Sequence, residues 1–175
     1  CIECVSGRAA DTPHMLQRAE GREAEIPIVQ IDYHFMKDDG EESKQIEDRF
    51  STTIGIVDCD TAVPLQLSIP QKGGSADYSV AALVSFLRRL GHTTVKIRSD
   101  GEQSIVNVLE AVAIKRLQTD NQKTQVERTP RYSSQSLGAV GAQQRILQGW
   151  TKTIRAATET DYKCKVGPAH VAWPW

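Results

Sequence analysis

The chain has 175 residues, a quarter of them charged, and its formal net charge is −1. This length suits one domain with a substantial core, and the near-neutral balance excludes nucleic-acid binding through overall charge, so any basic surface must be local. No apolar run approaches the about 18 residues of a membrane span, so we expect no membrane partner.

The cysteines stand at positions 1, 4, 59 and 164 and do not form a disulfide framework. They indicate a reduced, intracellular compartment. Cys1-x-x-Cys4 has the spacing of two zinc ligands, and His14 is the only nearby candidate for a third. Because zinc needs four ligands, we expect Cys1 and Cys4 to be one half of a severed Zn²⁺ site.

The first part of the chain predicts three strands. Residues 26–35 alternate apolar side chains with Gln30, Asp32 and His34, as in a strand with one buried face. Residues 38–48 hold six acids and one base and are expected to form an exposed, mobile loop. Two further β-rich runs, 52–57 and 63–69, flank a turn signal, so the three strands should form an antiparallel meander.

The second part of the chain predicts helices alternating with strands. The expected elements are a helix from an N-cap at Ser75 to a C-cap at Gly91, a strand over 94–99, a helix from near Gly101, a weak strand over 124–128 and a long helix from 136–138. Leu147, Trp150 and Ile154 are expected to form the apolar stripe of the last helix, with Trp150 in the core. The order predicts an α/β fold, a mixed five-stranded sheet flanked by helices whose first three strands are antiparallel.

Two aspartates, Asp32 within the first strand and Asp100 at the end of the fourth, are the candidate site. A carboxylate is unfavourable inside a strand and costly to bury without a partner. In a sheet of this order the first and fourth strands can lie side by side, and a divalent cation would relieve the repulsion between the two carboxylates. Asp100 alone is equally well explained as the N-cap of the next helix, but that role does not account for Asp32.

Four motifs occur in order along the chain. They are Val29-Gln-Ile-Asp-Tyr-His-Phe35, Pro70-Gln-Lys-Gly-Gly74, Ile97-Arg-Ser-Asp-Gly-Glu102 and Ser133-Ser-Gln-Ser-Leu-Gly-Ala-Val140. Together they resemble the catalytic core of a retroviral-type integrase, most similar to the copia-type retrotransposon branch. Cys1-x-x-Cys4, followed by Pro13-His14, resembles the end of that family's N-terminal zinc finger. The resemblance covers essentially the whole chain.

The resemblance implies an RNase H-like fold and DNA integration by an Asp, Asp, Glu triad with Mg²⁺ or Mn²⁺. Asp32 and Asp100 match the first two acids, whereas Gly141 occupies the third position, on the first turn of the last helix. Gln143 and Gln144 offer only neutral amides in its place. We therefore expect the integrase fold with little or no strand transfer, and Zn²⁺ only if the missing upstream ligands are present.

The resemblance also implies a division of the chain. Residues 1–25 would be the remnant of the zinc finger and a linker, 26–160 the integrase core-like domain, and 161–175 the start of a truncated C-terminal segment. Both ends look cut from something longer. The expected partners are DNA and further copies of the chain, in the nucleus or a retroelement particle.

Four bases are candidates for contacts to DNA phosphates, and ordinary surface bases are the equally weighted alternative. They are Arg128, Arg131, Lys152 and Arg155. His34 shares a face with Asp32 and is either an outer-shell group of the site or a plain strand histidine.

Two other functions compete with an impaired integrase. The first is a non-enzymatic DNA-binding or assembly module that keeps the fold. The second is an α/β domain with a single magnesium site, such as a phosphoacceptor receiver. The three-strand meander argues against a receiver, because receivers begin with βαβ units.

Overall fold

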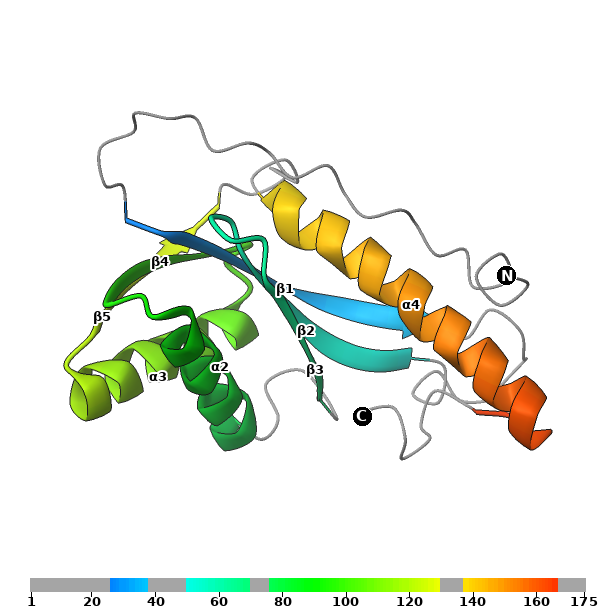
Figure 1. Cartoon of the computed structure of the whole chain (residues 1–175). Helices are drawn as coiled ribbons and strands as arrows, with labels where there is room; N and C mark the ends of the chain where they lie inside the picture. Colours follow the sequence, from blue (N-terminus) through cyan, green and yellow to red (C-terminus); the bar gives the residue numbers. More distant parts are fainter. Residues whose placement is uncertain (1–25, 38–49, 70–75, 130–136, 167–175) are drawn as a thin grey trace.

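The computed structural model describes residues 26–37, 50–69, 76–129 and 137–166 (Figure 1). The elements are β1 (Ile28–Lys37), β2 (Phe50–Asp58), β3 (Pro64–Ile69), α2 (Ala76–Leu90), β4 (Thr94–Ser99), α3 (Gln103–Asp120), β5 (Lys123–Arg128) and α4 (Gly138–Tyr162). The predicted order of strands and helices is confirmed. The predicted N-cap Ser75 and the acidic segment 38–48 lie outside the described residues.

The five strands form one mixed sheet in the order β3-β2-β1-β4-β5. β1, β2 and β3 pair antiparallel, whereas β4 pairs parallel with both β1 and β5. The two predictions that mattered most for the site are therefore confirmed: the meander, and the placement of the first strand beside the fourth. The architecture is α/β and consistent with an RNase H-like fold.

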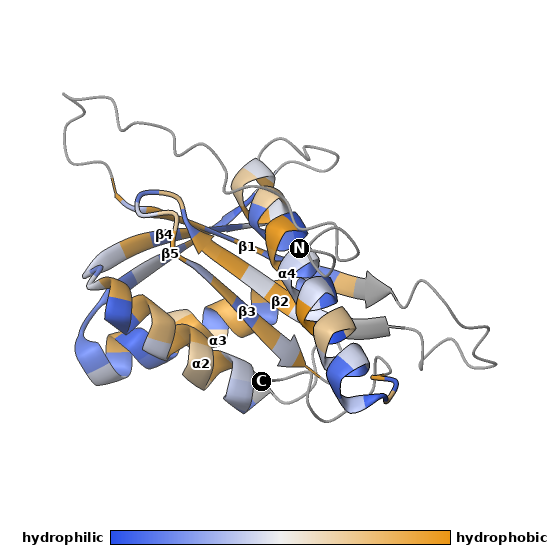
Figure 2. Cartoon of the chain, turned by 45° about the vertical axis from the view of Figure 1, so that its right-hand side comes forward, coloured by the Kyte–Doolittle hydropathy of each residue, from blue (hydrophilic) through white to orange (hydrophobic). Residues whose placement is uncertain are grey.

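Helices cover the two faces of this sheet differently. α2 and α3 pack against each other on one face, while α4 crosses β1, β2 and β3 on the other (Figure 1). Figure 2 shows apolar residues of the strands, α2 and α3 gathered together, whereas α4 carries mixed hydrophilic and hydrophobic residues. One face of the sheet is thus a large apolar core, and the other is a smaller and more polar interface.

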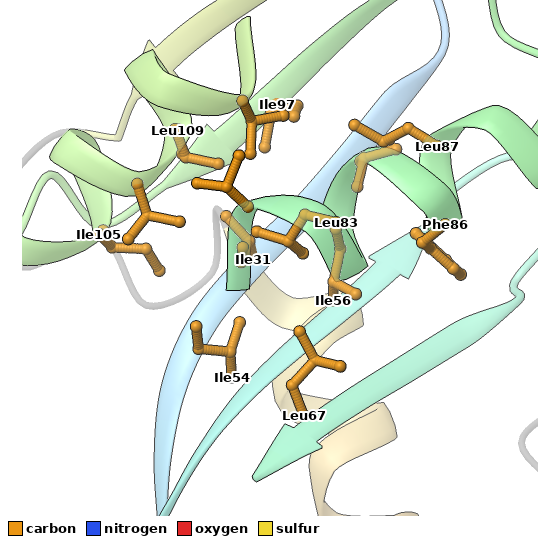
Figure 3. Packing of buried hydrophobic residues seen from close by; sticks show 14 of the residues in the cluster. Ile31, Ile54, Ile56, Leu67, Leu83, Phe86, Leu87, Ile97, Ile105 and Leu109 are labelled. Atoms are coloured by element: carbon orange, nitrogen blue, oxygen red, sulfur yellow. The ribbon is translucent and has the colours of Figure 1, made fainter. Parts of the chain in front are cut away.

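The main core lies between the sheet and the α2–α3 pair. Alternate residues of β1, including Val29 and Ile31, are fully buried there, as the period of two predicts. The side chains that interdigitate in Figure 3 are Ile31, Ile54, Ile56, Leu67, Leu83, Phe86, Leu87, Ile97, Ile105 and Leu109. Under α4 the apolar contacts reduce to a small cluster of Val57, Leu137 and Val140, with Ala139 packed against it.

A buried polar cluster lies at the end of the sheet away from the candidate site, where it links the β2–β3 turn, the α2–β4 connection and α3. Asp58, which is fully buried, accepts a hydrogen bond from Thr61 Oγ1 at 2.6 Å and lies 3.2 Å from His92 Nε2. Arg116, also fully buried, donates from Nη2 to the His92 carbonyl at 2.5 Å. His92 therefore bridges a buried anion and a buried cation from two different elements.

Two glycines meet backbone requirements that other residues meet poorly. Gly91 ends α2 with φ +75°, as its predicted C-cap role requires, and Gly101 turns the chain from β4 into α3 with φ +80°. Both angles lie in the left-handed region, where a Cβ is unfavourable.

The prediction that Trp150 belongs to the core is wrong. Trp150 is 47% exposed and Ile154 is 66% exposed, whereas Val140 and Gln144 are buried on the same helix. The neighbouring Gln148 contacts His34 of β1 and Gly149 is buried, so α4 still lies over the sheet at this turn and the predicted stripe is on its solvent side. Among the described residues, no helix is both long enough and apolar enough to cross a membrane.

Candidate active site and nucleic-acid interface

The parallel pairing of β1 and β4 places the chain segments that carry the two candidate aspartates side by side in the interior of the sheet. The paired residues include Val29 with Ile97 and Gln30 with Arg98. Two further residues along each strand lead to Asp32 and Asp100. The two acids, 68 positions apart in the chain, are thus neighbours in the register of adjacent strands.

Asp100 has a structural role as well as a place in the site. Its residue is exposed, and its Oδ1 accepts a hydrogen bond from the Glu102 backbone N–H at 3.0 Å. Glu102 is the N-cap residue of α3, so Asp100 closes the turn that precedes the helix. The alternative that Asp100 is the N-cap of this helix is therefore wrong, because Asp100 stands two residues before the N-cap. Its second carboxylate oxygen, Oδ2, takes no part in this hydrogen bond.

Asp32 lies in the middle of β1, directly opposite Gly55 of β2. Its backbone carbonyl accepts a hydrogen bond from Gln144 Nε2 at 3.3 Å. A Cβ at position 55 would lie 2.6 Å from that same nitrogen, closer than real contacts allow. Gly55 therefore makes the space in which the Gln144 amide reaches the strand beside Asp32.

The N-terminus of α4 is held by a residue of β1. Gln30 Oε1 accepts hydrogen bonds from the backbone N–H groups of Ala139 at 3.0 Å and Val140 at 3.2 Å. The first N–H groups of a helix have no partner within the helix, and Leu137, the N-cap residue of α4, makes no side-chain cap. A strand glutamine thus supplies the cap and sets where the first turn of α4 stands.

Gly141 lies on that first turn, next to the capped residue Val140. A Cβ built on Gly141 meets no heavy atom within 4 Å. The backbone thus leaves room for a side chain at the position where the integrase resemblance expects glutamate, but the residue at this position is a glycine.

His34 is held by α4 as well. Its Nε2 pairs with Nε2 of Gln148, and its backbone carbonyl accepts from Thr53 Oγ1 at 3.3 Å. Burial lowers the pKa of His34, which favours the neutral imidazole. Gln30, Asp32 and His34 thus form a row on β1 that meets α4 at successive turns. Two strand residues and one helical turn advance by similar lengths, about 6.6 Å and about 5.4 Å.

The predicted phosphate-binding bases that the structure describes lie on β5 and α4. Arg128 is exposed and lies 3.9 Å from Glu110, while Arg155 donates from Nε to Glu159 at 2.9 Å. Lys152 is exposed on α4. Arg131 lies outside the described residues, as do Cys1, Cys4 and His14 of the predicted zinc half-site.

Within the described ranges no three His, Cys, Asp or Glu side chains gather as a metal-binding group. Asp32 and Asp100 are thus a pair rather than a triad there. Reasoning from the sequence missed Gln30, Gly55 and Gln144, the residues that position α4 against this pair. A glycine within a strand was the available signal, because such a glycine often marks a close approach of another part of the chain.

Comparisons with known proteins add little to this geometry. No family model matches the chain, and no curated protein matches it. Among solved structures, a chain from the cryo-EM structure of the simian T-cell lymphotropic virus intasome, in complex with PP2A regulatory subunit B56 gamma, aligns with a TM-score of 0.40 and 12% identity. The alignment covers 80% of this chain and 44% of that one. A likeness this distant carries no argument about activity.

Proposed function

We propose that this chain is the core-like domain of a copia-type retrotransposon integrase, which binds DNA and has lost most of its capacity for strand transfer. The observation that carries the proposal is the parallel pairing of β1 with β4 up to Gln30 and Arg98, two residues before Asp32 and Asp100. Residue 141 lies on the first turn of α4, which packs on β1. Two of the sequence motifs of the resemblance fall on β1 and on β4 with the turn that follows it, and the last one ends on the first turn of α4; Pro70–Gly74 lies outside the described residues.

Two carboxylates fit one Mg²⁺ or Mn²⁺, since Mg²⁺ is commonly bound through one or two carboxylates together with waters and substrate phosphates. Asp32 and Asp100 would hold such an ion, which would supply charge stabilisation at a phosphoryl oxygen. The donor set does not fit a second ion. Gly141 has no side chain, and the Gln144 amide already donates to the Asp32 carbonyl.

The expected loss of activity is large. Removing one preorganised group that stabilises developing charge commonly lowers the rate by about 10²–10³. A ligand shared by two metal ions should matter at least as much, because both the attacking and the leaving oxygens depend on the ions.

A comparison at position 141 tests this proposal. Gly141→Glu adds the missing carboxylate where there is room for it, and Gly141→Gln is the matched control with the same length and no charge. We expect Gly141→Glu alone to bind Mn²⁺ about tenfold more tightly by calorimetry and to raise joining of short duplex DNA by about 10²-fold. Robust joining by the unchanged chain would contradict the impairment.

A non-enzymatic DNA-binding or assembly module is the second candidate, and the glycine at position 141 favours it. This role predicts salt-sensitive DNA affinity in the unchanged chain. It also predicts that Gly141→Glu binds metal but joins no DNA, because other parts of the catalytic machinery would have been lost.

A further inference from the structure

Within the described ranges, one face of the sheet is covered by a helix over three of its five strands only. α4 crosses β1, β2 and β3, and α2 and α3 lie on the opposite face (Figure 1). Among the described residues, therefore, no helix packs on the α4 side of β4 and β5. A sheet face without a covering element is open to solvent or to a partner.

The register identifies the residues on this open face. Val95 and Ile97 of β4 point into the main core, so their neighbours along the strand point to the α4 side. Arg98 Nε donates to Glu127 Oε2 across to β5 at 2.8 Å, which places both side chains on this side. We call the face formed by the alternate residues of the two strands the β4–β5 polar face: Thr94, Lys96, Arg98, Lys123, Gln125 and Glu127.

The charge of the β4–β5 polar face differs from that of the whole chain. It carries three cations and one carboxylate, and Arg98 with Glu127 forms a pair. Lys96 and Lys123 make no ion pair with another described residue, so two positive charges remain unneutralised. The six residues of the face therefore carry a net charge of +2.

The β4–β5 polar face is continuous with the candidate site. Lys96, Arg98 and Asp100 occupy alternate positions along β4, so a ligand lying along the strand would pass from the two cations to Asp100 at the end of the strand. A polyanion with regularly spaced phosphates fits this row of cations, because each cation can neutralise one phosphate and release its counterions.

We infer that the β4–β5 polar face binds the phosphate backbone of duplex DNA and leads it to the Asp32–Asp100 pair. This inference rests on the proposed DNA-binding function, but it assigns the contacts to Lys96 and Lys123 rather than to the bases of α4. Glu127 weakens the contact by neutralising Arg98.

Salt-dependent DNA binding tests the inference. In fluorescence titrations of a short duplex over a range of salt concentrations, Lys96→Gln and Lys123→Gln should each weaken binding several-fold. Each should also reduce the slope of log K against log[salt] by about one. Glu127→Gln should tighten binding, because it frees Arg98 for a phosphate. Lys115→Gln, at an exposed position of α3 on the other side of the sheet, is the matched control and should change neither quantity.

The outcomes separate the inference from the proposed function. If the Lys96→Gln and Lys123→Gln variants bind DNA as tightly as the unchanged chain, the assignment to this face is overturned while DNA binding itself stands. An equal loss in Lys115→Gln would also overturn the assignment, because net charge alone would explain it. No binding by the unchanged chain at low salt would overturn both. Unchanged urea unfolding midpoints establish that each variant is folded.

Discussion

Gly55 and Gln144 are complementary: a Cβ on the glycine would lie 2.6 Å from Nε2 and 2.9 Å from Cγ of the glutamine. The glutamine uses this space to donate to the Asp32 carbonyl at 3.3 Å. One missing side chain on β2 thus allows α4 to lie close enough to β1 to bond with it.

Gly55→Ala should destabilise the protein by about 1–2 kcal/mol, because overpacking a buried site commonly costs about 1–3 kcal/mol and alanine regains part of that through a less flexible unfolded chain. The check is a double-mutant cycle in urea. Gln144→Ala removes the clashing atoms, so the glycine substitution should cost markedly less in that background. Additive effects of the two substitutions would contradict the contact.

Gln30→Met should also destabilise, since it removes the acceptor of the Ala139 and Val140 N–H groups while keeping a similar side-chain size. A buried donor left without a partner costs about 1–3 kcal/mol. Hydrogen exchange offers a local measurement, in which the amides of residues 139 and 140 should exchange faster while those in the α2–α3 core keep their relative protection. Uniform acceleration across the whole chain would point to a general loss of stability instead.

Arg116→Met should cost about 1–3 kcal/mol, because it leaves buried hydrogen-bond acceptors without a donor. The guanidinium donates to the His92 and Lys123 carbonyls, to Thr124 Oγ1 and to Gln122 Oε1, all from a fully buried position. Chemical denaturation measures the loss. Arg88→Met is the control, because Arg88 bonds Asp120 at the surface, where a pair is worth about 0–1 kcal/mol. Equal losses in the two variants would contradict a special role for the buried residue.

Cys59 should react slowly with iodoacetamide at neutral pH. Cys59 is an exposed residue, but partial desolvation of its thiol, followed by the nearby Asp58 carboxylate, raises the pKa of Cys59 to about 11 from an ordinary value of 9.0. At neutral pH the thiolate fraction is about a hundredfold smaller than for an ordinary thiol. A more basic thiolate is also more nucleophilic, and each thiolate reacts about tenfold faster. The net expectation is labelling about tenfold slower than for an unperturbed thiol.

Peptide mass spectrometry checks this, with a short model peptide containing an unperturbed thiol as the comparison. Because the raised pKa favours the neutral thiol in the folded state, the protein should lose stability as pH rises from about 9 toward about 11, where the unfolded chain ionises first. Equal labelling rates for Cys59 and the peptide at pH 7.5 would contradict the shift.

Local pattern was enough to predict the strands and helices of this chain. The alternation in residues 26–35 and the span of β4 at Thr94–Ser99 follow from periods set by covalent geometry, which any compact fold must respect. The order of elements then allowed the first and fourth strands to be placed together, and Asp32 and Asp100 with them. Trp150 shows where local pattern fails, because an apolar stripe does not decide which face of a helix docks on the sheet.

The sequence by itself determined the fold class, the positions of the two aspartates on their strands and the absence of a carboxylate at Gly141. Only the tertiary structure decided how α4 is held, through Gln30, Gly55 and Gln144, and which part of the sheet it leaves open. The physical reason is distance along the chain. Gln30 and Ala139 are 109 positions apart, and their bond depends on how a helix docks and rotates on a sheet, which no local periodicity encodes.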